Sequence, residues 1–202
     1  MNQTITAEEA KRAIYFDVEG QADSINKEKR DPILGGVLVD GSYEVTLFGD
    51  GLEVAARAKI WNHQPLKQFL EELSNRARLE GRKLVYFTKR EEELFTRFDV
   101  NIKDVGIDLK PLANKNENFK KCRTTYRSNK KKLKDPNTSK TTIDMLRTKS
   151  HGLLTLFAAE RGLPRPHSYA LGKIGGYCEK IKDQARVKNT YEAWSKGTKK
   201  NL

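Results

Sequence analysis

The sequence predicts an α/β fold whose mixed sheet has three antiparallel strands first and parallel strands after them. Three short β-rich runs come first in the chain, and helical and strand-like segments then alternate. Neighbouring runs joined by turns form antiparallel meanders, whereas a strand reached through a crossover helix joins the sheet in parallel. We therefore expect flanking helices and a helical C-terminal region around one sheet.

The antiparallel strands are expected close to the N-terminus. Residues 13–19, AIYFDVE, form a short apolar run that ends on acids, as a buried strand with a polar exit does. Residues 33–39, ILGGVLV, precede Asp40-Gly41, a dipeptide favoured in tight hairpin turns, and residues 43–48 follow it. These three runs predict a meander.

The parallel part of the sheet is expected after a crossover helix. Apolar residues recur at intervals of three and four in residues 64–78, which indicates an amphipathic helix that ends at Gly81. The chain then offers a short strand at residues 83–87, a helix at 91–98 and a further strand at 105–109. Strand, helix and strand therefore follow one another, as in a parallel addition to a sheet.

We divide the chain into a sheet core of residues 1–109, a basic insertion or loop of residues 110–138, and a helical region of residues 139–202 packed on the core. Helices in the last part are expected at about residues 139–161, 171–181 and 187–195. We expect the natural chain to continue beyond Leu202, as part of a protein with further domains.

The charge of the chain favours a polyanionic partner. The 202 residues include 39 Lys and Arg against 27 Asp and Glu, a formal net charge of +12. Such a balance is typical of proteins that bind nucleic acid, although a basic protein without such a partner is the alternative. The two cysteines, Cys122 and Cys178, form no zinc or disulfide pattern, and no apolar run is long enough to cross a membrane. We expect a cytoplasmic protein with no membrane partner.

A pair of acids ends the first expected strand. Asp17 and Glu19 are separated by one residue, so on a regular strand both side chains point to the same face. Carboxylates are the ligands that Mg²⁺ or Mn²⁺ prefers, and such ions can activate a water and stabilise the leaving oxygen of a phosphodiester. The alternative is a solvated pair at an ordinary polar strand end.

With this element order, the run IYFDVEG resembles the first strand of the DEDD-type exonucleases of the RNase H-like superfamily. It is more similar to the predicted RNase H-like nucleases that accompany RecB-type proteins. In that family a second acid follows an aromatic residue, and YFTKREEELF matches it with Glu91 by spacing and Glu92 in reserve. A strand ending in Asp-Leu also belongs to the family pattern, and Asp108-Leu109 matches it.

The resemblance implies a metal-dependent, 3'-5' exonuclease-like activity with water as the nucleophile. Asp17, Glu19 and Glu91 would bind Mg²⁺ or Mn²⁺, and Asp108 would support them. The final acid of the family lies on a helix after a Tyr or His, and the surroundings of Asp183 do not match it. We expect that acid to lie beyond Leu202, which would leave this chain with weak metal binding and slow cutting or none.

Each acid also has an ordinary structural interpretation. Acids in a first helical turn, such as those at residues 91–93, complement the helix dipole, and Asp108 is a common strand-end residue. The alternative function is therefore a non-catalytic nucleic-acid-binding module with the same fold. A protein scaffold is a third possibility. DNA and RNA, and exonuclease and endonuclease, remain open.

The most basic stretch of the chain lies between residues 110 and 135, where aromatic residues are interleaved with cations. Cations release counterions from phosphates, and aromatic rings stack on unpaired bases. The alternative is a solvated loop. The residues that we expect to contact nucleic acid are Lys120, Lys121, Arg123, Tyr126, Arg127, Lys130, Lys131 and Lys132.

Overall fold

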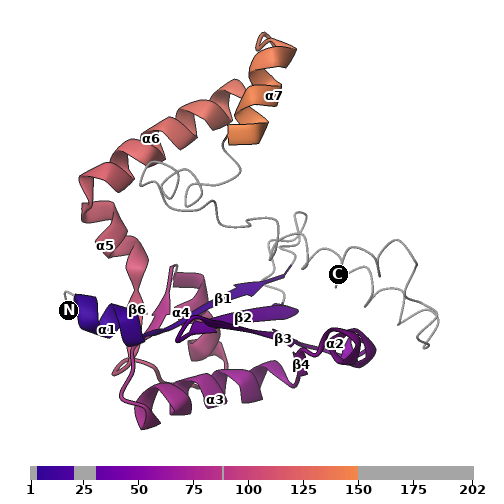
Figure 1. The fold of residues 1–202 in the computed structure, drawn as a ribbon, viewed down its shortest axis with the longest axis vertical. Helices are drawn as coiled ribbons and strands as arrows, with labels where there is room; N and C mark the ends of the chain where they lie inside the picture. Colours follow the sequence, from indigo (N-terminus) through magenta and orange to yellow (C-terminus); the bar gives the residue numbers. More distant parts are fainter. Residues whose placement is uncertain (1–3, 21–30, 88, 150–202) are drawn as a thin grey trace. The chain divides into compact units, whose positions relative to one another are not determined.

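The computed structural model describes residues 4–20, 31–87 and 89–149 (Figure 1). The described chain divides after Leu109 into two compact units. The first unit holds a six-stranded sheet with helices beside it, and the second consists of helices. The predicted α/β class, with a mixed sheet and flanking helices, is confirmed.

The predicted meander forms the antiparallel half of the sheet. Strand β1 (Ile14–Glu19) pairs antiparallel with β2 (Leu34–Val39), which pairs antiparallel with β3 (Ser42–Leu47). The turn between β2 and β3 places Asp40 at φ 48° and Gly41 at φ 78°. Two successive positive φ values are typical of the tight hairpin turns whose twist matches that of the strands.

The parallel half of the sheet is built on the other side of β1. Strand β5 (Leu84–Tyr86) pairs parallel with β1, and β6 (Gly106–Asp108) pairs parallel with β5. A short strand that the sequence analysis missed, β4 (Asn62–His63), lies parallel to β3 at the opposite edge. The strand order is therefore β4-β3-β2-β1-β5-β6, with β1 between the two halves.

Among the described residues of the first unit, four helices accompany the sheet. The predicted α3 (Leu66–Leu79) and α4 (Lys89–Arg97) are present. Two short helices were not predicted, α1 (Ala7–Arg12) and α2 (Glu53–Lys59). Helix α1 begins with a capping box, in which the side chains of the N-cap threonine and of a glutamate three residues later each bond the other's backbone N–H, so a local signal for it exists in the sequence.

The main core lies between the sheet and helices α3 and α4. Phe16 of β1 packs edge-to-face on Phe95 of α4, with ring centroids 5.4 Å apart, and on Tyr86 of β5, at 5.8 Å. Leu70 and Leu73 of α3 are buried in the same cluster. Figure 1 shows α3 running along this face of the sheet. A smaller apolar cluster forms around α2, at the end of the sheet where β2 begins and β3 ends.

Gly35 allows two aromatic rings of this core to lie against β2. A Cβ atom at this position would lie 2.8 Å from Cζ of Phe48 and 2.9 Å from Cζ of Phe69, which are too close. Both rings are buried, so neither can move into solvent. We therefore expect Gly35→Ala to lower the free energy of unfolding by about 1–3 kcal/mol, the usual cost of overpacking a core. Chemical denaturation measures this loss of stability. The control is Gly41→Ala, whose Cβ would contact nothing but would strain a positive φ, so this variant reports the cost of the turn alone.

The second unit is helical where the sequence analysis expected a basic insertion or loop. Helix α5 (Leu109–Lys115) enters it from the first unit, followed by α6 (Glu117–Lys132) and α7 (Lys140–Lys149). Phe119 and Cys122 are buried on one side of α6, so an apolar stripe does exist within the charged segment.

Helix α7 accounts for the start of the helix expected at residues 139–161. The rest of that helix, the two later helices and the surroundings of Asp183 lie outside the described residues. Within the described ranges, no helix combines the length and the apolar character that a membrane span requires.

Candidate functional site

The fold gathers acidic side chains at the carboxyl ends of the two central parallel strands. Strands β1 and β5 run in the same direction, with Tyr15 beside Val85, so both strands end at the same edge of the sheet. Helix α4 begins at Lys89, directly after β5, and therefore starts beside the end of β1. Acids at the end of β1 and in the first turn of α4 thus lie close together although they are far apart in sequence.

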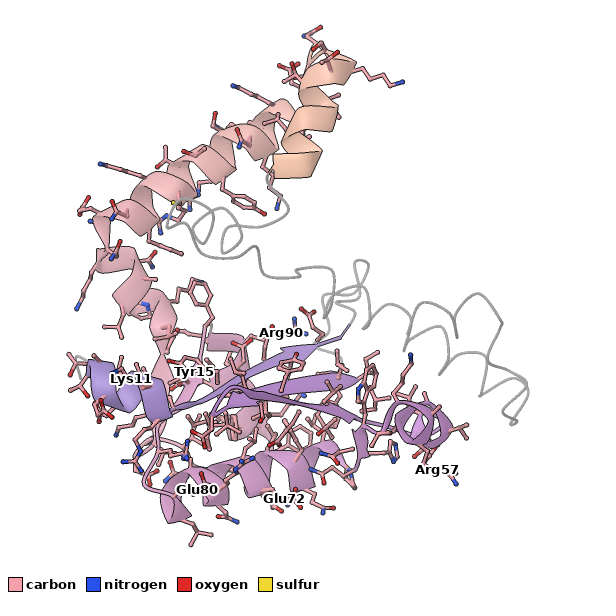
Figure 2. All side chains as sticks on the ribbon, in the orientation of Figure 1. Lys11, Tyr15, Arg57, Glu72, Glu80 and Arg90 are labelled. Carbon is pink, nitrogen blue, oxygen red and sulfur yellow. The ribbon has the colours of Figure 1, made fainter. Side chains whose placement is uncertain are left out.

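Asp17 and Glu19 point away from the main core. Residues of a strand alternate between its two faces, and their neighbours Phe16 and Val18 are buried in the cluster beneath α3 and α4. Asp17 is exposed and Glu19 is partly exposed. In Figure 2 the labelled Tyr15, which shares their face, lies on the opposite side of the sheet from α3.

The pKa of Asp17 is raised by two effects that act together. The protein around the carboxylate removes part of its hydration even though the side chain is exposed, and the nearby negative charge of Glu91 raises the pKa further. The backbone N–H of Val18 donates to Asp17 Oδ1 at 2.9 Å and opposes this rise, as does the positive charge of Arg90. The effect of Glu91 on Asp17 agrees with the adjacent positions of the end of β1 and the start of α4.

Glu19 belongs to the same electrostatic cluster. Its pKa is raised first by burial, then by the charge of Asp17, and more weakly by that of Glu91, while Arg90 again lowers it. The charge of Glu91 on α4 therefore acts on both acids of β1 at one sheet edge. We call Asp17, Glu19 and Glu91 the carboxylate cluster.

Glu91 is placed by the packing of its helix. Leu94 and Phe95, three and four residues later on the same side of α4, are buried in the core, and Glu91 itself is only 5% exposed. Glu92, the reserve candidate from sequence, is exposed, and its charge acts on Tyr86. Of the acids at residues 91–93, Glu91 is thus the one whose charge acts on Asp17 and Glu19.

Asp108 lies on a different strand and on the other face of the sheet from Asp17. It ends β6, two strands from β1, and is paired in register with Tyr86. Because Tyr86 packs against Phe16 on the core side, the alternation of side chains places Asp108 on the face opposite Asp17. Its charge contributes to the raised pKa of Tyr86, whose main cause is burial.

Two residues that the sequence did not single out interact electrostatically with the carboxylate cluster. The charge of Arg90 lowers the pKa of both Asp17 and Glu19, and Arg90 is exposed. Tyr43 of β3 has a raised pKa because the protein removes part of the hydration of its phenol, although the side chain is exposed, and because of the charges of Asp17 and Glu19. The hairpin turn at Asp40-Gly41 sets the register of Tyr43 against β2. The register of β2 against β1 has no local signal in the sequence, so the position of Tyr43 relative to Asp17 could not be predicted.

The predicted nucleic-acid-binding residues lie on α6 in the second unit. Lys121, Arg127 and Lys131 are exposed on the side of the helix opposite its buried stripe. Tyr126 is partly buried, and Lys130 Nζ lies 5.5 Å from the centre of its ring, within cation–π distance. Lys132 is exposed in the last turn.

The other two predicted contacts of α6 already have polar partners in the structure. Lys120 forms an ion pair with Glu117 at 2.5 Å, and Arg123 donates to Asn114 Oδ1 at 2.5 Å. These two cations are also only partly exposed. The exposed cations of the helix are therefore the better placed for a phosphate backbone.

The carboxylate cluster presents hard oxygen donors and an excess of negative charge, which is the chemistry that a divalent cation relieves. Among residues 4–20, 31–87 and 89–149, no three His, Cys, Asp or Glu side chains form a group ready to hold a metal ion. No family model, curated protein or solved structure matches the chain.

The raised pKa of Asp17 predicts that its ionised form destabilises the fold. Because its folded pKa lies above its unfolded value, the folded state binds more protons between the two values, and stability falls as pH rises through this window. We expect Asp17→Asn to raise the melting temperature at neutral pH without metal, and to change it little below both pKa values. Thermal unfolding at several pH values measures this effect; a lower melting temperature at neutral pH would contradict it.

Proposed function

We propose that the chain is a metal-dependent nuclease domain that hydrolyses phosphodiester bonds of DNA or RNA at the carboxylate cluster. The observation that carries this proposal is that Asp17 and Glu19 leave the sheet where α4 brings Glu91, and that burial and the charge of Glu91 raise the pKa of both strand acids. Carboxylates whose pKa is raised by burial and by a neighbouring negative charge cost stability, and such groups concentrate at functional sites.

The order of the strands also supports the proposal. An antiparallel β1-β2-β3 meander, with two parallel strands added on the other side of β1, is the order expected of an RNase H-like sheet. The two acids of the D-x-E run lie on the central strand β1. We propose the RNase H-like fold on this basis, with the active site at the carboxyl end of β1.

Asp17, Glu19 and Glu91 would hold the Mg²⁺ or Mn²⁺. All three supply the oxygen donors that a hard cation prefers, and they concentrate negative charge; in the described residues these side chains are not gathered into a ready metal site, so binding would have to draw them together. A bound ion would lower the pKa of a coordinated water and stabilise charge on the leaving oxygen. The Val18 N–H fixes Asp17 through Oδ1, and the buried packing of α4 fixes Glu91. Arg90 supplies a positive charge next to the acids.

The exposed cations of α6 would hold the phosphate backbone without reading sequence. A cation that contacts a phosphate releases counterions, so binding weakens as salt rises. We expect the combined change of Lys121, Arg127 and Lys131 to Gln to reduce the slope of log affinity against log salt by roughly 2 to 3, because each lost contact contributes about 0.7–0.9. Fluorescence anisotropy over a salt series measures that slope.

A charge-matched control separates local contacts from net charge. Lys11, Arg57 and Lys67 are exposed cations of the first unit, and changing all three to Gln removes the same charge. This control is expected to leave most of the slope intact. An equal loss in both triple variants would show that net charge, and not α6, determines binding.

A non-catalytic nucleic-acid-binding module is the second candidate. It is favoured by the exposed basic side of α6, which involves none of the carboxylates. A module of this kind would bind nucleic acid equally well with and without a chelator, and would bind unchanged after Asp17→Asn.

Cleavage of labelled single- and double-stranded DNA and RNA, with Mg²⁺, with Mn²⁺ and with chelator, tests the enzyme. Metal-dependent cleavage that is lost in Asp17→Asn supports the nuclease. Binding without cleavage under every metal condition supports the module. Position-specific labels at the two ends of the substrate then distinguish stepwise removal of nucleotides from internal cutting.

A further inference from the structure

Four cations lie together on one side of the second half of helix α6. Arg127, Lys130, Lys131 and Lys134 follow one another at intervals of three and four residues, and residues at these intervals are neighbours on a helix surface. Lys134 lies two positions past the end of α6 at Lys132, but its N–H donates to the Lys131 carbonyl oxygen at 3.0 Å, so the turn continues to it. All four residues are exposed. We call them the basic patch.

The cations of the basic patch repel one another. The four residues form four like-charged pairs at intervals of three or four, and such pairs destabilise a helix. The helix dipole favours cations in the last turn, which offsets part of the cost, but Arg127 lies before that turn. The patch therefore lowers the stability of α6 unless an anion lies against it.

The acids nearest to the basic patch along the chain are engaged elsewhere. Glu117 is the one acid of α6, and it pairs with Lys120 in the first half of the helix. Asp135 follows Lys134 directly, but its Oδ1 accepts the Asn137 N–H at 2.9 Å in the next turn of chain. Within residues 4–20, 31–87 and 89–149, no ion pair includes a cation of the patch. The patch is therefore placed to take an anion from outside these residues.

The size of the basic patch fits a short length of one phosphate backbone. Its first and last residues are seven positions apart, a rise of about 10 Å along a helix axis. About three successive phosphates of one strand occupy that length, at about 3.4 Å each. A helix seated between two backbones needs cations on both flanks. The other exposed cations of α6, Lys121 and Lys132, are eleven residues apart and form no second cluster.

We propose that the basic patch binds about three successive phosphates of one nucleic-acid strand, and so holds the substrate by a single backbone. This inference rests on the proposed function and names the substrate class that the contact requires: one strand, whether free or within a duplex. The phosphates would remove the repulsion within the patch, and the cations would release the counterions condensed on the strand. An acidic protein segment offers no comparable release of counterions, so nucleic acid is the better occupant.

The test measures binding of a labelled single strand and of the matching duplex, by fluorescence anisotropy in the presence of chelator. We expect the double change of Arg127 and Lys131 to Gln to weaken binding of both at least about tenfold at about 0.1 M salt, because each lost contact contributes about 0.7–0.9 to the salt slope. Lys110 and Lys115 of α5 are exposed cations of the same unit, and changing both to Gln removes the same charge. This control is expected to weaken binding less than about threefold.

Two further measurements separate the basic patch from a structural role. Exchanging the two cations, Arg127→Lys with Lys131→Arg, keeps the charge and is expected to bind both substrates as the wild type does. Without nucleic acid, the Arg127 and Lys131 to Gln variant is expected to melt at or above the temperature of the wild type, because repulsion within the patch is relieved. A lower melting temperature would mean that these cations serve the fold, and would overturn the inference.

Equal weakening by the patch variant and the α5 control overturns the inference. Weakening confined to the duplex also overturns it, because two backbones would then contact the helix. A poly-glutamate peptide of the same charge that binds as tightly as the single strand, and less tightly to the patch variant, would make an acidic protein the occupant instead. Because chelator prevents metal-dependent cleavage, these results are independent of catalysis. Patch-dependent binding without cleavage would contradict the nuclease alone, and cleavage with no binding loss in the patch variant would contradict the basic patch alone.

Discussion

Asp17→Asn is expected to reduce metal-dependent cleavage more than any other single change. Asparagine keeps the size of the side chain, and its carbonyl oxygen can accept the Val18 N–H that Asp17 Oδ1 accepts at 2.9 Å, but it removes the charge. Loss of a group that only supports a metal ligand typically costs about 10- to 100-fold, so loss of a ligand is expected to exceed about 100-fold in kcat. Single-turnover cleavage at saturating protein measures the change.

Two features of Asp17→Asn make the result interpretable. The variant is expected to be at least as stable as the wild type at neutral pH, because it removes a carboxylate whose pKa is raised, so lost activity will not reflect unfolding. Glu92→Gln removes an equal charge from an exposed neighbour of Glu91 and is the matched control. If Asp17→Asn cuts as fast as the wild type, the carboxylate cluster is not the site of hydrolysis.

Phe95→Ala is expected to have the largest effect on stability. Phe95 is fully buried, packs edge-to-face on Phe16, and lies one helical turn after Glu91 on α4. Truncating a buried phenylalanine costs about 3–5 kcal/mol, because contacts are lost and a cavity remains. Equilibrium denaturation of the variant against the wild type gives the change in the free energy of unfolding.

The same helix supplies the control for Phe95. Thr96 is the next residue and is exposed, so Thr96→Ala is expected to change stability by no more than about 0.5 kcal/mol. Phe95→Leu retains most of the apolar volume and tests whether the ring itself positions Glu91. A loss below about 1 kcal/mol for Phe95→Ala would mean that α4 is not held by this contact, and the position of Glu91 would need another explanation.

Much of the sheet could be predicted from sequence because its signals are local. The run of residues 13–19, the turn at Asp40-Gly41 and the helical spacing of residues 64–78 each fix an element without reference to the rest of the chain. Helix α1 was missed because its capping box, Thr6 to Glu9, precedes only a short polar helix. Strand β4 has two residues, too few for any periodicity.

Helix α6 was not predicted because its sequence is so rich in charged residues. Its buried stripe of Phe119 and Cys122 is short, and the many lysines around it have the composition of a solvated loop. Composition describes how much of a segment is charged, whereas helix formation here depends on which side the few apolar residues occupy.

The candidate site was only partly predictable because it depends on the assembled sheet. That Asp17 and Glu19 share a face follows from spacing alone, but the approach of Glu91 requires β5 to lie beside β1 and α4 to begin at their common edge. Asp108 carries the same strand-end signal as Asp17, yet the register with Tyr86 places it on the other face. Register is a long-range property that no local pattern contains.

The most direct test of the carboxylate cluster is a calorimetric titration of Mn²⁺ into the wild-type chain and into Asp17→Asn, without nucleic acid. We predict that the wild type binds the ion with measurable heat and that Asp17→Asn does not, because the proposed site takes a ligand from each of Asp17, Glu19 and Glu91. Equal heats in the two proteins, or no binding by the wild type, would contradict a metal-dependent site at Asp17, Glu19 and Glu91.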